Sequence, residues 1–272
     1  MMKVCIVGLG QIGGSFAAAL TRRRLARVTG VTRRAATAAR ARRMGLLASA
    51  GTDVKAVGDA DVVVLATPVR TLLRQIPEVA GLVRPGGLLT DVGSTKVDIA
   101  RAFRAARPRG PVLCGHPMAG NEKAGLDGVD PRLFEGRPWT LIPCAGRRAD
   151  FRGFERLVEG VGARPVWMAS AADHDFKVAR VSHVPYLLAY ALMGTEAEAV
   201  RVAGNSFRDA TRVALSDPGM VIDFLLTNRG AIRKAAGRLA GRLRALVSRI
   251  GRGDVDALRA LLGEARARRA RL

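Results

Sequence analysis

One of the three histidines of this chain and a glycine-rich segment have the residue types and the spacing to do chemistry together. The segment Gly8 to Gly13 has the Gly-x-Gly-x-x-Gly spacing of a dinucleotide-binding turn. His116 lies downstream in the run Cys-Gly-His-Pro-Met-Ala-Gly, whose glycines and proline indicate a tight loop. An imidazole titrates near neutral pH, so it can take the proton of an alcohol while a bound nicotinamide takes the hydride. The pair predicts a dehydrogenase, and a purely structural histidine is the alternative.

The glycine-rich segment also stands where a phosphate-binding turn requires it. It follows a strand predicted over Lys3 to Val7 and opens a helix predicted from Ile12 to about Arg24. In this context the first glycine permits a tight turn, the second lets the backbone approach the pyrophosphate, and the third lets helix and strand pack closely. Unpaired N–H groups at the helix N-terminus would bind the phosphates. The predicted cofactor-binding residues here are Gly8, Gly10, Gln11, Ile12 and Gly13.

The residues after the second predicted strand, Arg27 to Val31, indicate which dinucleotide binds. An acidic side chain there would hydrogen-bond to the ribose hydroxyls and favour NAD. This chain has Thr32, Arg33 and Arg34 instead, and a hydroxyl with two guanidinium groups suits a 2′-phosphate. We therefore expect NADP in preference to NAD. The cofactor site is also expected to include the two residues that follow a strand predicted over Ala60 to Ala66, namely Thr67 and Pro68.

Two kinds of periodicity divide the chain. Short apolar runs first alternate with helical segments, as in parallel βαβ units, with further strands predicted over Leu88 to Val92, Pro111 to Cys114 and Trp139 to Ile142, and helices over Ala35 to Met44 and Leu72 to Val83. After about Val166 the pattern is helical, over Asp173 to Tyr190 with a kink at Pro185, Ala197 to Arg212, Met220 to Arg249 and Val255 to Ala270. The expected fold is α/β: a Rossmann-type dinucleotide-binding domain over residues 1–168, then an all-helical domain over 169–272.

Composition limits the classes of protein that fit. The chain has 272 residues, of which 49% are hydrophobic, enough for a large core and against disorder. No apolar run is long enough to span a bilayer, and the three cysteines, Cys5, Cys114 and Cys144, lack the spacing of metal ligands. We expect a soluble cytoplasmic protein with reduced thiols, no metal and no membrane contact.

The formal net charge of +22 raises the question of nucleic-acid binding. Only six of the 45 basic residues are lysines, and the arginines are spread through the chain, which indicates a compositional bias. Aromatic residues that could stack on bases make up 4% of the chain, and no nucleic-acid motif is recognisable. We expect no nucleic-acid partner and an attraction for small anionic metabolites instead.

Four further segments accompany the glycine turn and His116: Asp91 to Lys96, Asn121 to Gly125, Ser182 to Tyr186 and Phe207 to Arg212. In order and spacing the whole set closely resembles the prephenate/arogenate dehydrogenase family of tyrosine biosynthesis, over Val4 to about Asn228. The resemblance implies oxidation of a cyclohexadienol at its C4 hydroxyl, with hydride passed to NAD(P) and the ring carboxylate lost as CO2. Arogenate would give tyrosine, and prephenate would give 4-hydroxyphenylpyruvate.

The resemblance also implies roles for individual residues. His116 would be the base on the C4 hydroxyl, Ser94 would hydrogen-bond to its imidazole and also border the cofactor, and Arg212 would pair with a substrate carboxylate. Three further substrate-site candidates have a structural or solvent-facing place as an equal alternative: Glu122, His183 and Arg208, which lies one helical turn before Arg212. Two roles remain open for Lys96, which could cap a loop or contact the cofactor. Asp209 could likewise brace the nearby arginines or lie on the surface. His174 is expected to be structural.

Tyr186, the fifth substrate-site candidate, departs from the family pattern. Members that act on prephenate often have a histidine at this position, where it is expected to meet the keto side chain. Tyrosine keeps a hydroxyl but lacks the imidazole. The departure favours the arogenate-using or dual-specificity branch.

The sequence leaves two alternative functions open and predicts an assembly state. A β-hydroxyacid-type dehydrogenase would use a lysine of the helical domain, for which Lys177 is the candidate, but it leaves the His116 run without a role. A non-catalytic nucleotide- or nucleic-acid-binding Rossmann protein would not need His116. The apolar positions from Val181 to Leu192 and from Val213 to Leu226 exceed what one layer can bury, so a homodimer is expected, as in the family that the chain resembles.

Overall fold

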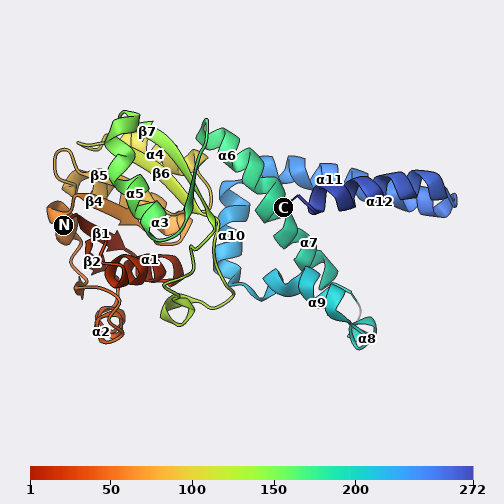
Figure 1. The fold of residues 1–272 in the computed structure, drawn as a ribbon, viewed down its shortest axis with the longest axis horizontal. Coiled ribbons are helices and arrows are strands. Elements are labelled where there is room, and N and C mark those ends of the chain that lie inside the picture. Colours follow the sequence, from red (N-terminus) through yellow and green to blue (C-terminus); the bar gives the residue numbers. More distant parts are fainter. Residues whose placement is uncertain (196, 272) are drawn as a thin grey trace.

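A mixed eight-stranded sheet forms the centre of the N-terminal part of the protein (Figure 1). The computed structural model describes residues 1–195 and 197–271. The strand order is β3-β2-β1-β4-β5-β6-β7-β8, and every neighbouring pair is parallel except β6 and β7, which are antiparallel. The strands are β1 (Lys3–Val7), β2 (Arg27–Val31), β3 (Ser49–Gly51), β4 (Val62–Leu65), β5 (Leu88–Asp91), β6 (Val112–Pro117), β7 (Pro138–Ala145) and β8 (Arg164–Trp167).

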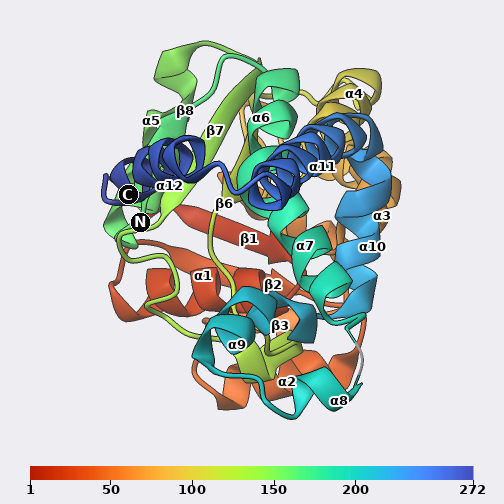
Figure 2. The same ribbon diagram turned by 90° about the vertical axis from the view of Figure 1, so that its right-hand side faces the viewer.

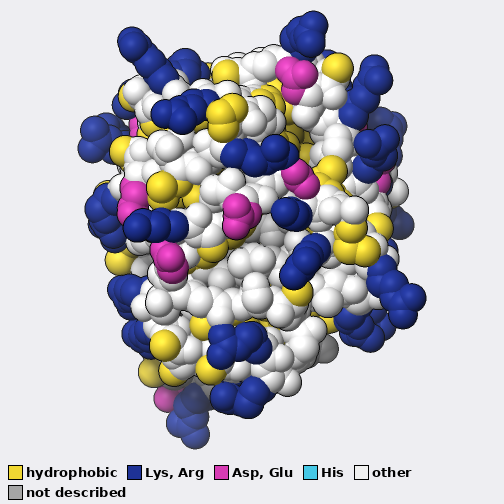
Figure 3. Space-filling view, turned by 90° about the vertical axis from the view of Figure 1, so that its left-hand side faces the viewer, with side chains coloured by type: hydrophobic (Ala, Val, Ile, Leu, Met, Phe, Trp, Pro, Cys, Tyr) yellow, Lys and Arg dark blue, Asp and Glu magenta, His cyan; other side chains and the backbone are white. Residues whose placement is uncertain are grey.

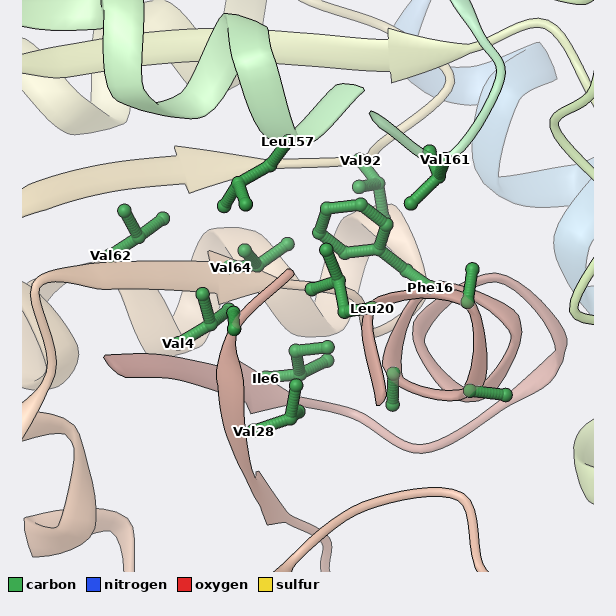
Figure 4. Close-up of a cluster of buried hydrophobic side chains, with 14 of the residues drawn as sticks. Val4, Ile6, Phe16, Leu20, Val28, Val62, Val64, Val92, Leu157 and Val161 are labelled. Atoms are coloured by element: carbon green, nitrogen blue, oxygen red, sulfur yellow. The ribbon is translucent and has the colours of Figure 1, made fainter. Parts of the chain in front are cut away.

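Helices cover both faces of this sheet, because its parallel strands are apolar on both sides. In β1, Val4 and Ile6 pack with Phe16 and Leu20 on one face (Figure 4). Cys5 and Val7 of the same strand pack on the other face. The first face also carries α2 and α5, and the second carries α3 and α4. The helices are α1 (Gln11–Arg22), α2 (Ala35–Arg43), α3 (Val69–Leu82), α4 (Val97–Ala106) and α5 (Arg152–Gly160).

The chain is helical after β8, and this part lies to one side of the sheet, with α11 and α12 extending furthest from it (Figures 1 and 2). Its helices are α6 (Ala171–Val178), α7 (Val184–Leu192), α8 (Ala197–Val200), α9 (Asn205–Thr211), α10 (Pro218–Thr227), α11 (Arg229–Gly251) and α12 (Val255–Arg269). Short 3₁₀ segments occur at Val54–Asp59, Gly125–Gly128, Arg148–Phe151 and Arg212–Leu215. The α/β fold class with a helical C-terminal part is confirmed. None of the helices in the two described ranges has both the length and the apolar character that crossing a membrane demands.

Three predicted helices have interruptions that the sequence pattern did not show. The helix expected over Ala197 to Arg212 forms two short helices, α8 and α9, and residues 201–204 between them are not helical. The helix expected over Met220 to Arg249 breaks at Asn228, whose side chain bonds across to other elements. The helix expected to kink at Pro185 instead has a π turn over Ala179–His183, directly before α7. Pro185 has no N–H to donate into this turn, and wide turns of this kind often stand at functional sites.

Many apolar side chains of the helical part remain exposed. The buried cluster there is small and contains Ala179, Val184, Val221, Phe224, Ile232 and Ala235. Exposed large apolar residues lie along α7, α10, α11 and α12 or, for Met193, directly after α7: Leu188, Met193, Met220, Ile222, Leu226, Leu243, Val247, Ile250, Val255 and Leu262. At the opposite end of the molecule, lysine and arginine side chains are spread over the face and interspersed with acidic ones (Figure 3).

Candidate active site

The glycine turn between β1 and α1 has the backbone that its sequence predicts. Gly8 has a φ of +108°, and a Cβ on it would lie 2.7 Å from the backbone of Ala66. A Cβ on Gly13 would lie 2.0 Å from the carbonyl oxygen of Gly8, so helix and strand pack this closely only without a side chain. A Cβ on Gly10 would meet nothing within 4 Å, so the space beside the turn is open.

This turn fits a dinucleotide. Helix α1 starts at Gln11, and its first turn contains no acidic residue. The partial positive charge of its N-terminal N–H groups is therefore not neutralised by a side chain, and these groups lie beside the open space at Gly10. Thr67 packs against the turn, since its Cγ2 atom would lie 2.8 Å from a Cβ on Gly8. At the end of β2, Arg33 and Arg34 are exposed, as is Pro68 after β4.

Gln11 has a further role that its place in the motif did not suggest. Its Nε2 atom donates to the carbonyl oxygens of Asn121 at 3.0 Å and Lys123 at 2.7 Å, and its Oε1 atom accepts from the Asn121 N–H at 3.2 Å. The glycine turn is thus joined to the loop that carries Glu122. Ile12 is half-buried against the sheet.

His116 is buried on β6, with 9% of its surface exposed. It belongs to the strand and not to a loop, since β6 continues to Pro117 and pairs His116 with Thr140 of β7. Its Nδ1 atom lies 3.0 Å from Nε2 of His174 on α6. The Nδ1 atom of His174 in turn lies 2.8 Å from Oδ1 of Asp175. His174 is therefore part of the site, although the sequence suggested only a structural place for it.

The geometry assigns the protons in this chain. A carboxylate only accepts, so Nδ1 of His174 donates to Asp175, and the Nε2 atom of neutral His174 accepts. His116 must then donate from Nδ1, which leaves its Nε2 atom with the free electron pair of a base. Burial, followed by the nearby charges of His174, Lys96 and His183, holds the pKa of His116 well below its usual value. The ring is thus neutral at physiological pH.

Asp175 joins this chain to the rest of the fold. Its carboxylate accepts from the backbone N–H of Lys96 at 2.7 Å and of Val97 at 2.9 Å, at the start of α4. Its carbonyl oxygen accepts from Nδ2 of Asn228 at 2.9 Å. Residues of α4, α6 and the α10–α11 junction therefore hold His174 in place.

A buried ion pair lies beneath the same site. Lys96 is fully buried, and its ammonium group donates to the Asp91 carboxylate and, at 2.7 Å, to the carbonyl oxygen of Gly115. Burial raises the pKa of Asp91, and the charge of Lys96 opposes this rise. Lys96 thus holds the backbone next to His116. Ser94 is half-buried on the same loop, and among the described residues no hydrogen bond joins it to His116.

The other predicted substrate residues come from the helical part and one loop. Arg212 begins a 3₁₀ turn after α9, and its Nη1 atom lies 3.5 Å from Oε2 of Glu122, both side chains being exposed. The Tyr186 hydroxyl lies 3.5 Å from Oγ of Ser216. Arg208 is exposed on α9 and Asp209 beside it likewise.

His183 is buried and stacks on Phe224, with ring centroids 4.3 Å apart. Its Nδ1 atom lies 3.2 Å from Nδ2 of Asn228, an amide nitrogen that donates, so the ring proton is on Nε2. That Nε2 atom is buried and has no hydrogen-bond partner within the described part of the chain. Burial lowers the pKa of His183 to about 4.

Comparison with known proteins decides the family. Residues 16–167 match the nucleotide-binding domain of prephenate dehydrogenase, and residues 170–264 match its dimerization domain. The chain belongs to the prephenate dehydrogenase family. It is a nicotinamide-dependent oxidoreductase, and the β-hydroxyacid alternative is not favoured. Lys177, the lysine on which that alternative depended, is an exposed residue of α6 that pairs with Asp173 at 2.8 Å.

One curated relative is the cyclohexadienyl dehydrogenase of Zymomonas mobilis. It is 32% identical over 267 residues, which cover 94% of this chain and 90% of the relative. Two longer relatives are named prephenate dehydrogenase, and the alignments span 65% of each.

Two solved structures share the fold over nearly their full length. Prephenate dehydrogenase of Aquifex aeolicus, in complex with hydroxyphenyl propionate and NAD+, has a TM-score of 0.90 at 30% identity, covering 99% of this chain and 97% of that one. Arogenate dehydrogenase of Synechocystis has a TM-score of 0.84 at 28% identity, covering 99% of both chains.

The sequence analysis did not assign three residues to the site that the structure places there: His174, Asp175 and Asn228. The sequence signal for the first two was the acidic pair flanking a histidine, Asp-His-Asp, at a helix start. Asn228 had no such signal, because a lone asparagine within an apolar and basic helical pattern has no characteristic spacing.

Proposed function

We propose that this chain catalyses the NADP-dependent oxidative decarboxylation of arogenate, with prephenate as a second, less preferred substrate of the same site. The observation that carries the proposal is the chain of hydrogen bonds from Asp175 through His174 to His116. It leaves one imidazole nitrogen basic, on the sheet whose first turn fits a dinucleotide. A base and a hydride acceptor are the two groups that alcohol oxidation needs.

The residues of the chain account for the proton in this reaction. The glycine turn would hold the nicotinamide dinucleotide, which would supply the acceptor for the hydride that leaves C4 of the substrate. Nε2 of neutral His116 takes the proton of the C4 hydroxyl, and His174 steadies the ring that becomes charged. Loss of the ring carboxylate as CO2 restores aromaticity and drives the reaction forward, so the protein mainly has to hold the reacting groups together. Ser94, half-buried on the neighbouring loop, is proposed to contact the C4 hydroxyl of the substrate and the cofactor.

We propose that cationic and hydrogen-bond-donating side chains of the helical part recognise the substrate. Arg212 is proposed to bind a carboxylate through two parallel hydrogen bonds, exchanging its exposed contact with Glu122 for the substrate. The buried Nε2–H of His183 and the hydroxyl of Tyr186 are proposed as donors to the substrate, and Arg208 as a second cation. A tyrosine at position 186 supports arogenate as the preferred substrate.

NADP preference and dimer formation belong to the same proposal. Thr32, Arg33 and Arg34 follow β2 without an acidic residue among them, and the two exposed guanidinium groups suit a 2′-phosphate. The apolar residues exposed along α7, α10, α11 and α12 support residues 169–272 as a domain that pairs with a second copy. Residues 1–168 then bind the dinucleotide.

Initial rates of nicotinamide reduction test this function. Prephenate and arogenate are each supplied with NAD and with NADP, and we expect the largest kcat/KM for arogenate with NADP. Turnover only with NAD would overturn the cofactor assignment, and turnover only with prephenate would overturn the substrate preference. The absence of turnover in all four mixtures would overturn the function itself.

A further inference from the structure

Two cysteines face each other on the strand pair that carries His116. Cys114 lies on β6, two residues before His116, and Cys144 lies on β7. Their Sγ atoms are 3.0 Å apart. Both are free thiols, as is Cys5 on β1. The proposed dehydrogenase reaction uses none of them.

The register of β6 and β7 explains this approach. Cys114 pairs with Ile142, so Cys144, two residues further along β7, has its side chain on the same face of the sheet. A shift of register between Val112 and Leu113 leaves Cys144 without a direct partner on β6. Such a bulge bends its strand locally and redirects the extra side chain. The thiol of Cys144 thereby reaches Cys114.

The two thiols differ in their environments. Cys114 is fully buried, and burial raises its pKa well above the usual value, so it retains its proton. Cys144 is half-buried, and the hydrogen bond that Cys114 donates lowers the pKa of Cys144. Burial raises the pKa of Cys5 to about 12, which makes Cys5 unreactive. The thiolate is the reactive form, so Cys144 is the nucleophile and Cys114 the thiol that follows.

We propose that Cys144 and Cys114 form an oxidation site, which hydrogen peroxide converts to an intrachain disulfide that lowers turnover at His116. The sulfur of Cys144 attacks one peroxide oxygen, the O–O bond breaks, and a sulfenic acid and one water result. The sulfur of Cys114 then attacks that of Cys144, the S–S bond forms, and the sulfenic oxygen leaves as a second water with the Cys114 proton. Two electrons pass from the sulfurs to the peroxide.

The link to the active site is the short backbone segment between Cys114 and His116. Gly115 stands between them, and its carbonyl oxygen accepts from Lys96 at 2.7 Å. A disulfide requires its sulfurs at about 2.05 Å, so the two sulfurs must approach by roughly 1 Å, and the part of this approach that side-chain rotation does not supply displaces β6 or β7. A misplacement of about 1 Å can cost about a hundredfold in rate. We expect kcat to fall about tenfold or more on oxidation and to recover with dithiothreitol.

Mass spectrometry tests the site without any substrate, so its outcome is independent of the proposed function. After stoichiometric peroxide we expect the intact mass to fall by about 2 Da, the mass of two thiol hydrogens. A non-reducing digest should contain one peptide pair, joined through Cys114 and Cys144. Cys5→Ser should behave like the unmodified chain, and Cys144→Ser should form no link. Absence of the linked peptides, or a link through Cys5, would overturn the site.

Initial rates before and after oxidation test the effect on turnover. The unmodified chain and Cys5→Ser should lose rate and regain it with dithiothreitol, whereas Cys144→Ser should keep its rate in peroxide. This arm depends on the proposed function, because it needs a turnover assay. A complete cross-link with unchanged kcat would overturn the effect on turnover and leave the oxidation site standing. An equal loss of rate in Cys144→Ser would assign the loss to another residue.

Discussion

The Nε2 atom of His174 lies 3.0 Å from the Nδ1 atom of His116, and this contact determines which nitrogen of His116 is basic. Asp175 holds the other nitrogen of His174, so the proton order along the chain has one solution while both rings are neutral. A buried imidazole with a fixed tautomer is ready to accept a proton, because neither rotation nor loss of water is needed first.

Replacing His116 by alanine should nearly abolish turnover. General-base catalysis contributes about 10² to 10⁴ in rate, and His116 is the base proposed here. NADP binding, measured by quenching of protein fluorescence or by calorimetry, should stay unchanged, because the glycine turn follows β1 and His116 lies on β6. Turnover that survives intact in His116→Ala would contradict the mechanism.

His174→Ala should lower kcat by about ten- to a hundredfold with little change in KM. The substitution removes a hydrogen bond of roughly 1.5–3 kcal/mol to a ring that becomes charged in the transition state. Lys177→Ala on the same helix, whose side chain is exposed, is the matched control and should keep its kcat. Equal kcat values in the two variants would show that His116 needs no partner at Nδ1.

Arg212→Ala should raise KM for the substrate far more than it lowers kcat. A guanidinium–carboxylate contact is worth about 1.5–3 kcal/mol, or roughly a ten- to a hundredfold change in KM. Glu122→Gln is a useful companion, since it removes the charge that competes for Arg212 and should lower KM. A higher KM in Glu122→Gln would assign Glu122 a direct part in binding.

Arg33→Ser combined with Arg34→Ser should shift the cofactor preference toward NAD. Each lost contact to a 2′-phosphate weakens NADP binding, and NAD, which lacks that phosphate, is unaffected. We expect KM for NADP to rise at least about tenfold, from one lost charge-assisted hydrogen bond. Arg22→Ser combined with Arg24→Ser, two exposed arginines at the end of α1 and just after it, removes the same two charges and controls for net charge. A parallel rise in KM for NAD would indicate a general effect.

Stability should decline in acid because of the buried histidines. Burial lowers the pKa of His183 to about 4, whereas an unfolded histidine titrates near 6.5. The unfolded chain therefore binds the extra proton first, so stability is full above pH 6.5 and falls as the pH drops toward 4. His183 alone contributes a slope of about 1.4 kcal/mol per pH unit. Urea unfolding between pH 7 and 4.5 should show a shallower slope in His183→Asn.

Local spacing in the sequence was sufficient for much of the fold. The glycine turn, the βαβ alternation and the change to helices after about Val166 are all recovered, because strand and helix periods depend on neighbouring residues. Strands β3 and β8 were not predicted, since short segments at a sheet edge carry weak periodicity. Helices α4 and α5 were missed although their buried residues recur at helical spacing, as at Ile99 and Phe103 and at Phe154 and Val158. The break at Asn228 was missed because its cause is a bond to Asp175, 53 residues away.

The sequence by itself determined that a dinucleotide-type glycine turn and a candidate catalytic histidine occur in one chain, because backbone sterics and side-chain chemistry at those positions are local. Only the tertiary structure decided which side chains that histidine contacts. His174 reaches His116 across 58 residues, and Gln11 reaches Asn121 across 110. Cys114 meets Cys144 across 30. Such contacts arise when packed layers bring distant segments together, and no periodicity along the chain records them.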